Sequence, residues 1–280
     1  MSATDRGRGD DRTLPITRVV AIALVPFLAV AAVILFAFPA RTGELFAWPI
    51  EPPLSAAVLA SAYVGGIWFF ARVPRSRWHE VRHGYPAVVV FAGALLVATL
   101  LHLDRFSANL SFAVWMALYA TTPFVAAALA VIQRPRDPGI PRSVDIVLPR
   151  FVRAGLVTIG LASAATGAVL LIAPQAAIGV WAWTLTPLTA QVTGAVLTLP
   201  GVVGVGLVRD ARWSAFRVLV QAQLVSLVAM AGSLVVHRDD LLADRWTTPL
   251  FAGLVGVAIA AYATLLLWGA SRSRGGGATR

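Results

Sequence analysis

The sequence predicts an all-α integral membrane protein of about eight transmembrane helices, arranged as two tandem four-helix repeats in parallel orientation. Three observations lead to this fold class. The chain is 58% hydrophobic and only 13% charged, whereas a soluble domain carries about 25% charged residues. Uncharged stretches of about 20 residues, enough to cross a bilayer as a helix, recur along the chain. The two halves also match each other at a spacing of about 135 residues.

Rare residue types carry the evidence for the repeat, because matches among Ala and Leu mean little in so apolar a chain. At the common spacing the pairs are Arg18 and Arg153, Pro39 and Pro174, Trp48 and Trp183, Trp78 and Trp213, Arg82 and Arg217, His102 and His237, and Asp104 and Asp239. A repeat of this kind indicates how a protein is built and leaves its chemistry open.

Each apolar stretch is continuous, which favours helices over the alternating strands of a membrane barrel. The expected spans are 17–38, 54–73, 84–103, 111–132, 152–173, 187–208, 213–236 and 247–269. The first stretch is longer than the apolar part of a signal peptide. Its flanking Arg18 and Pro39 have partners in the second half, so it is interpreted as a span of the first repeat.

Arginine distribution predicts the orientation. The net charge of +10 comes from Arg alone, since the chain has no Lys. With the N-terminus in the cytoplasm, 19 of the 23 basic residues fall on cytoplasmic segments, and only Arg41, Arg105, Arg238 and Arg245 fall outside. This is the positive-inside distribution. We therefore expect a multi-pass protein with both termini in the cytoplasm. The Arg- and Ala-rich composition favours a bacterial plasma membrane.

An even number of spans in each half places both halves the same way up. The expected organisation is a disordered cytoplasmic tail over 1–16, a first repeat over 17–132, a cytoplasmic linker over 133–150, a second repeat over 151–270 and a disordered tail over 271–280. Arg residues flank the apolar stretches, so the expected partners are the lipid bilayer and its anionic headgroups, and not nucleic acid. The absence of Cys excludes disulfides, thiolate metal sites and Cys nucleophiles.

The loops after the first and fifth spans share a Trp–Pro–Leu order. One interpretation is an aromatic belt at the membrane interface. The other is a structured lip over a cavity, with Trp48, Glu51 and Trp183 as substrate-binding candidates. Arg82 and Arg217 join these candidates as a paired anion site, or else serve as interfacial anchors. The small residues of the second and sixth spans predict close helix packing at the centre of the protein.

Two patterns could hold a metal ion. His79-Glu80-Val81-Arg82-His83 resembles the zinc metalloprotease signature over these five residues, and the resemblance implies His79 and His83 as ligands and Glu80 as the base. The second pattern is His102 with Asp104 and its copy, His237 with Asp239, at the outer ends of spans three and seven. Parallel repeats would place these four side chains at equal depth, where they form a metal site or simply polar helix ends.

Three functional classes remain open on this basis. The favoured one is a permease-like protein with a substrate site between the two repeats. A membrane-embedded metalloenzyme would use His79 to His83 or the His102 and His237 pair. A non-catalytic assembly partner of other membrane proteins is the third. No catalytic residue is assigned, the cofactor is left open, and no span carries a mid-membrane Asp or Glu of the kind that ion-coupled pumps commonly use.

Overall fold

The computed structural model describes residues 11–137 and 145–275. Within them lie eight helices that are long and apolar enough to cross a membrane. They are α1 (Pro15–Ala37), α3 (Pro53–Arg72), α5 (Gly84–Leu101), α6 (Leu110–Gln133), α7 (Arg150–Ile172), α9 (Pro187–Arg209), α10 (Ser214–Val236) and α11 (Thr247–Gly275). The described residues form no β-strand, only isolated bridges. The predicted all-α multi-pass membrane fold is confirmed.

Short helices lie between the spans. They are η2 (Pro39–Arg41), α2 (Thr42–Leu45), η3 (Val73–Arg75), α4 (Trp78–Val81), η4 (Leu103–Arg105), η5 (Arg134–Arg136), α8 (Pro174–Ile178) and η6 (Arg238–Asp240). Proline begins both α3 and α9, where its missing N–H costs no helical hydrogen bond. The side chain of Asn109 caps α6, and that of Asp240 accepts a 2.8 Å hydrogen bond from Leu54 N in the first turn of α3.

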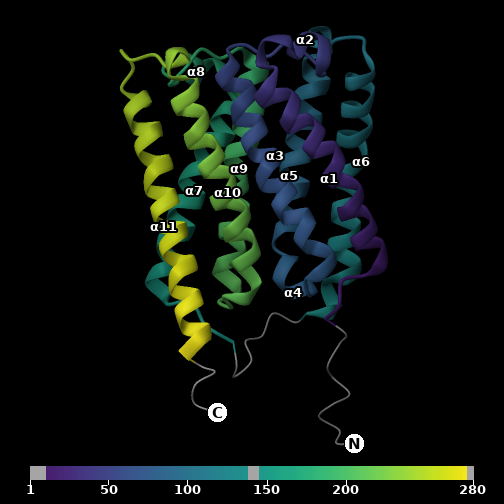
Figure 1. The fold of residues 1–280 in the computed structure, drawn as a ribbon, viewed down its shortest axis with the longest axis vertical. Coiled ribbons are helices and arrows are strands. Elements are labelled where there is room, and N and C mark those ends of the chain that lie inside the picture. Colours follow the sequence, from purple (N-terminus) through teal and green to yellow (C-terminus); the bar gives the residue numbers. More distant parts are fainter. Residues whose placement is uncertain (1–10, 138–144, 276–280) are drawn as a thin grey trace, which may run out of the picture.

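The spans form a bundle with two distinct ends (Figure 1). We call one the Arg-rich end; it carries the start of α1, the end of α11, α4, and the connections between α6 and α7 and between α9 and α10. The opposite end carries α2, α8, and the connections after α5 and α10.

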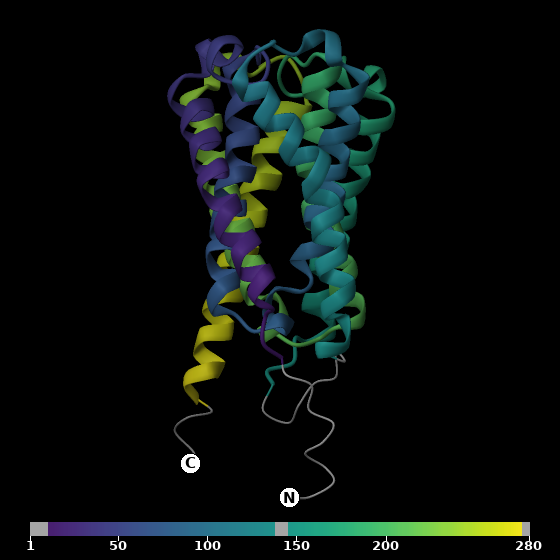
Figure 2. The same cartoon turned by 90° about the vertical axis from the view of Figure 1, so that its right-hand side faces the viewer.

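The eight spans pack as two rows of four. In the first row α1 packs on α3, α3 on α10, and α10 on α11. In the second row α6 packs on α5, α5 on α9, and α9 on α7. Figure 2 shows the two rows edge-on, with α1 leading one and α6 leading the other. Each row therefore contains two helices from each half of the chain. The rows pack directly on each other where α3 meets α9, and the short helix α4, which connects the rows, packs on α10.

The central helices of the rows are the most enclosed. Buried residues make up 72% of the most apolar window of α3 and 61% of that of α9, against 39% or less in the other spans. Small residues allow this packing. Gly167 of α7 faces Gly194 of α9 so closely that a Cβ on Gly167 would lie 2.6 Å from the carbonyl oxygen of Gly194. The predicted packed centre at the second and sixth spans is thus present.

The predicted tails and linker differ from the structure at their edges. Residues 11–14 precede α1 and are held in place, because Trp78 N donates a 2.9 Å hydrogen bond to Asp11 O. The helix α11 continues to Gly275, beyond the expected boundary at 270. Residues 1–10, 138–144 and 276–280 lie outside the described part of the chain.

Candidate functional site

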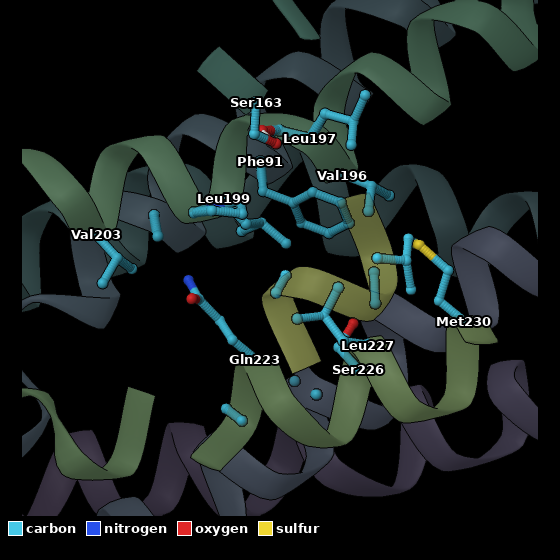
Figure 3. Close-up of a pocket in the computed structure, with 18 of the residues that line it drawn as sticks. Phe91, Ser163, Val196, Leu197, Leu199, Val203, Gln223, Ser226, Leu227 and Met230 are labelled. Atoms are coloured by element: carbon cyan, nitrogen blue, oxygen red, sulfur yellow. Dashed lines mark hydrogen bonds between the residues drawn. The ribbon is translucent and has the colours of Figure 1, made fainter. Parts of the chain in front are cut away.

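A cavity of about 660 Å³ lies between the two rows. Every spanning helix contributes to its wall, and Phe91, Val196, Leu227 and Met230 are typical of the side chains that line it (Figure 3). Its volume falls in the range of roughly 300–1,000 Å³ of small-molecule sites. The wall is overwhelmingly apolar, so the cavity suits a hydrophobic molecule.

The cavity reaches the outer surface of the bundle. Several of its lining residues are partly exposed: Phe27 of α1 is 44% exposed, Ile159 of α7 is 39% exposed, and Leu254 of α11 is 58% exposed. These helices stand at the ends of the rows, where α1 is opposite α6 and α7 is opposite α11. An opening between the row ends would face the bilayer, since these helices are the outermost of the bundle.

Polar side chains in the wall are few, and several of them form hydrogen bonds with other groups of the protein. The hydroxyls of Tyr63 and Tyr119 lie 2.9 Å apart and bond to each other. Ser163 Oγ donates to the carbonyl of Leu197 at 2.8 Å. Thr166 Oγ1 donates to the carbonyl of Ala162 at 3.0 Å. Two buried donors of the wall, Gln223 Nε2 and Trp181 Nε1, have no hydrogen-bond partner among the described residues.

Beneath the cavity, at the Arg-rich end, five ionisable side chains form a cluster that we call the ion cluster: Arg82, His83, Asp137, Asp210 and Arg212. Arg212 makes a bidentate pair with Asp137, at 3.0 and 2.6 Å. It also reaches Asp210 Oδ2 at 2.8 Å. Arg82 contacts the same two carboxylates, at 3.3 Å to Asp137 and 3.0 Å to Asp210. Two cations thus face two anions.

The surroundings of the ion cluster shift its proton affinities. Burial lowers the pKa of His83, which favours the neutral imidazole and a cluster with no net charge. For Asp210, burial alone would raise the pKa, but hydrogen bonds from His83 and Arg212 hold it well below its usual range. The side chains of Asp210 and Arg212 are 1% and 4% exposed. Such a pair is stable only while both partners remain, since either charge left alone would be buried without compensation.

The ion cluster lies next to residues of the cavity wall. His83 directly precedes Gly84, which lines the cavity. The His83 ring stacks on Phe216 with centroids 4.6 Å apart. The ion cluster also joins separate parts of the chain, because Arg82 and His83 follow α4, Asp137 follows α6, and Asp210 and Arg212 lie between α9 and α10.

The two predicted lip tryptophans are core residues. Trp48 is 1% exposed and packs against Phe46, Phe106 and Trp115. Trp183 is fully buried, and its Nε1 donates a 3.0 Å hydrogen bond to Ser55 Oγ. Neither ring lies at the lipid-facing surface, where an aromatic belt would place it.

The remaining substrate-binding candidates are not brought together. Glu51 and Arg217 are exposed, and Arg82 belongs to the ion cluster. None of the five, from Trp48 to Arg217, is among the residues that line the cavity. The lip does reach the cavity through Trp181 and Ala182, the neighbours of Trp183.

The predicted metal ligands have separate surroundings. His102 Nε2 lies 3.1 Å from Gln191 Oε1. Asp104 pairs with the adjacent Arg105, and Asp239, which is 96% exposed, lies beside Arg238. His237 ends α10. Among the described residues, no three His, Asp or Glu side chains gather in a way that could hold a metal ion.

The residues of the metalloprotease-like pattern have structural partners. His79 Nδ1 lies 2.5 Å from Asp11 Oδ2, and Glu80 Oε2 accepts a 2.8 Å hydrogen bond from Arg77 N at the start of α4. His83 lies 3.0 Å from Asp210. The helix is interrupted between α4 and α5, so His79 and His83 do not lie on one continuous helix as the signature requires.

Three members of the ion cluster are absent from the residues that the sequence singles out: Asp137, Asp210 and Arg212. Each lies in an Arg-rich connection that is typical of a solvated cytoplasmic loop. Two acidic residues could have indicated the cluster. Asp137 and Asp210 are isolated carboxylates among arginines, just after the ends of two predicted spans. Their burial depends on contacts more than 70 residues apart in sequence.

No protein-family model matches the chain, and neither a characterised protein nor a solved structure gives a match. The function proposed below therefore depends on the geometry of the cavity.

Proposed function

We propose that this is a permease-like membrane protein that takes a hydrophobic molecule from the bilayer into the cavity between its two rows of helices. The observation that carries the proposal is the apolar cavity of about 660 Å³, which partly exposed residues of the outer helices α1, α7 and α11 help to line. A structural or assembly role would be served equally well by a filled core, since unfilled space lowers stability.

The proposal includes an internal repeat, with one copy over 17–132 and the other over 151–270. Hydrogen bonds that recur at equivalent positions in and next to the two copies support it. Backbone bonds join equivalent residues of the two halves in the same way. Trp78 N to Asp11 O corresponds to Trp213 N to Ile146 O, Ser107 N to Ala47 O corresponds to Leu242 N to Ala182 O, and the bridge between Arg12 and Arg77 corresponds to that between Val147 and Arg212. The repeat also relates one row to the other. The helices of the first row, α1, α3, α10 and α11, correspond in the repeat to α7, α9, α5 and α6, which form the second row.

In this proposal the Arg-rich end faces the cytoplasm of a bacterial cell, where exposed arginines contact anionic lipid headgroups. Arg75, Arg134 and Arg217 are examples of exposed cations at this end. Among the described residues, fewer exposed arginines lie at the opposite end. This difference supports the orientation that the positive-inside rule favours.

The test is photo-crosslinking of the purified protein in lipid nanodiscs with hexadecane that carries a mid-chain diazirine. We expect saturable labelling of the cavity wall, at α10 residues such as Leu227 and Met230. The Ala258→Trp substitution places a large side chain in the cavity wall and should abolish this labelling. Ala260→Trp is the matched control, since Ala260 is exposed on the same helix and does not line the cavity.

Labelling confined to outward-facing residues such as Leu267, which is 73% exposed, would contradict the proposal. So would wall labelling that Ala258→Trp leaves unchanged. In either case the space between the rows would not be a binding site for a hydrophobic molecule.

A further inference from the structure

The side-chain amide of Gln223 is the one of the two unpartnered wall donors that lies inside a spanning helix. Gln223 lies near the middle of α10, and so at a depth close to the centre of the bilayer. Figure 3 shows the side chain extending from α10 toward Leu199 and Val203 on the facing helix α9. Its Nε2 is buried and has no hydrogen-bond partner among the described residues. At this depth no bulk water is available to supply one.

An unpartnered buried amide is costly. A donor left without an acceptor in a protein interior has lost its hydrogen bonds to water and gained none in return. Leu or Met at this position would fill similar space without that cost, and Met230 does so two turns further along α10. A bound molecule that brings an acceptor oxygen would satisfy the amide, so the amide favours such molecules over pure hydrocarbons.

Water is a poor alternative partner for Gln223. The small pocket beside the amide, of about 10 Å³, has barely the volume of one water molecule. Apart from Gln223 itself, the only residue of its lining with a polar side chain is Tyr262. A buried water needs 2–4 polar partners, and this lining offers few. Gln223 also lines the larger cavity, so rotation of its amide group would present Nε2 to an acceptor there.

We propose that the cavity binds an amphipathic lipid-like molecule, with a long apolar chain and one carbonyl or ester oxygen that accepts a hydrogen bond from Gln223 Nε2. This inference rests on the proposed function and names the chemical class of its ligand. The apolar wall holds the chain, and the amide selects molecules that carry an acceptor. Recognition by one buried hydrogen bond discriminates through the cost of leaving the donor unpaired.

Competition experiments test the inference. The diazirine-bearing hexadecane serves as reporter, and methyl palmitate and hexadecane serve as competitors with chains of equal length. In the wild-type protein we expect methyl palmitate to displace the reporter at a lower concentration than hexadecane. In Gln223→Leu that advantage should shrink by about fivefold, the worth of one net hydrogen bond. Comparing ratios between the two proteins cancels the different partitioning of the competitors into the bilayer.

Two control variants make the result specific. Thr166→Val removes a wall hydroxyl that already bonds to Ala162, so the wild-type ratio should persist. Trp181→Phe removes the other buried donor in the wall that lacks a partner among the described residues. This variant should also keep the wild-type ratio of the two competitors. Trp181 follows α8 at the opposite end of the bundle, whereas Gln223 lies inside the spanning helix α10.

The outcomes separate the two proposals. If the reporter never labels the cavity wall, the proposed function itself fails. If the reporter labels the wall but the competitor ratio is the same in wild type and Gln223→Leu, the amide does not select the ligand and this inference is overturned. Loss of the ester's advantage in Trp181→Phe alone would overturn it as well, and would place the acceptor at the opposite end.

Discussion

At the scale of single residues, the ion cluster shows how four charges can be buried together. Arg82 and Arg212 each touch both Asp137 and Asp210, so no charge lacks a counter-charge. The arrangement is asymmetric between the halves, because Asp210 and Arg212 correspond to Arg75 and Arg77 in the first half. The ion cluster therefore exists once, and the loss of one member cannot be compensated by a second copy.

Neutralising Asp210 should destabilise the fold strongly. In Asp210→Asn, two buried guanidiniums would face only Asp137, and removal of one partner from a buried pair costs about 3–5 kcal/mol. We expect a marked fall in the thermal unfolding midpoint in mild detergent. Asp104→Asn is the control, because its pair with Arg105 is about 70% exposed and should contribute little. Equal midpoints for the two variants would show that the ion cluster does not stabilise the protein.

His83 should make stability depend on pH. Burial lowers its pKa in the folded state below the ordinary value, roughly 6.5, that it regains on unfolding. Below that value the unfolded chain binds a proton that the folded chain does not, so stability falls as the pH drops from 7.5 to 5.5. In His83→Gln the unfolding midpoint should fall less over this range. In the control His237→Gln the wild-type pH dependence should persist, and a fall that His83→Gln leaves unchanged would assign it to another group.

At the scale of helices, the sequence contained most of the information. The apolar length of each stretch located all eight spans, and the two starting prolines of α3 and α9 marked where these helices begin. The neighbours of each helix could not be predicted. The packing of α3 with α10 and of α5 with α9 joins opposite halves of the chain, and such pairings depend on the shape of whole helix surfaces. The cavity was equally hidden, because composition shows which residues are present and not where space remains.

The tight contact between α7 and α9 gives a prediction at this scale. Gly167→Leu would push a side chain into the backbone of α9 at Gly194. Overpacking of this kind costs about 1–3 kcal/mol, so the unfolding midpoint should fall. Gly155→Leu is the matched control on the same helix, because nothing lies within 4 Å of a Cβ there. If both variants unfold like the wild type, the two helices are not held by this contact.

At the scale of the whole molecule, the orientation in the membrane can be tested directly. The chain has no Cys, so a single introduced thiol can be labelled without background. In intact cells, a membrane-impermeant maleimide should label Asp239→Cys, which lies at the opposite end and is 96% exposed. Arg75→Cys, exposed at the Arg-rich end, should be labelled only after permeabilisation. The reverse result would place the Arg-rich end outside the cell.

The path of the chain between the two rows has a mechanical consequence. The backbone crosses from the first row to the second between α3 and α5, and returns between α9 and α10. Both crossings lie at the Arg-rich end, and the ion cluster ties them together. At the opposite end the rows meet only through non-covalent contacts, such as that between Trp183 and Ser55. Among the described residues, the two rows are thus joined covalently at one end and only by side-chain and backbone contacts at the other, so a change in the distance between the rows would be easiest at the tryptophan-bearing loops.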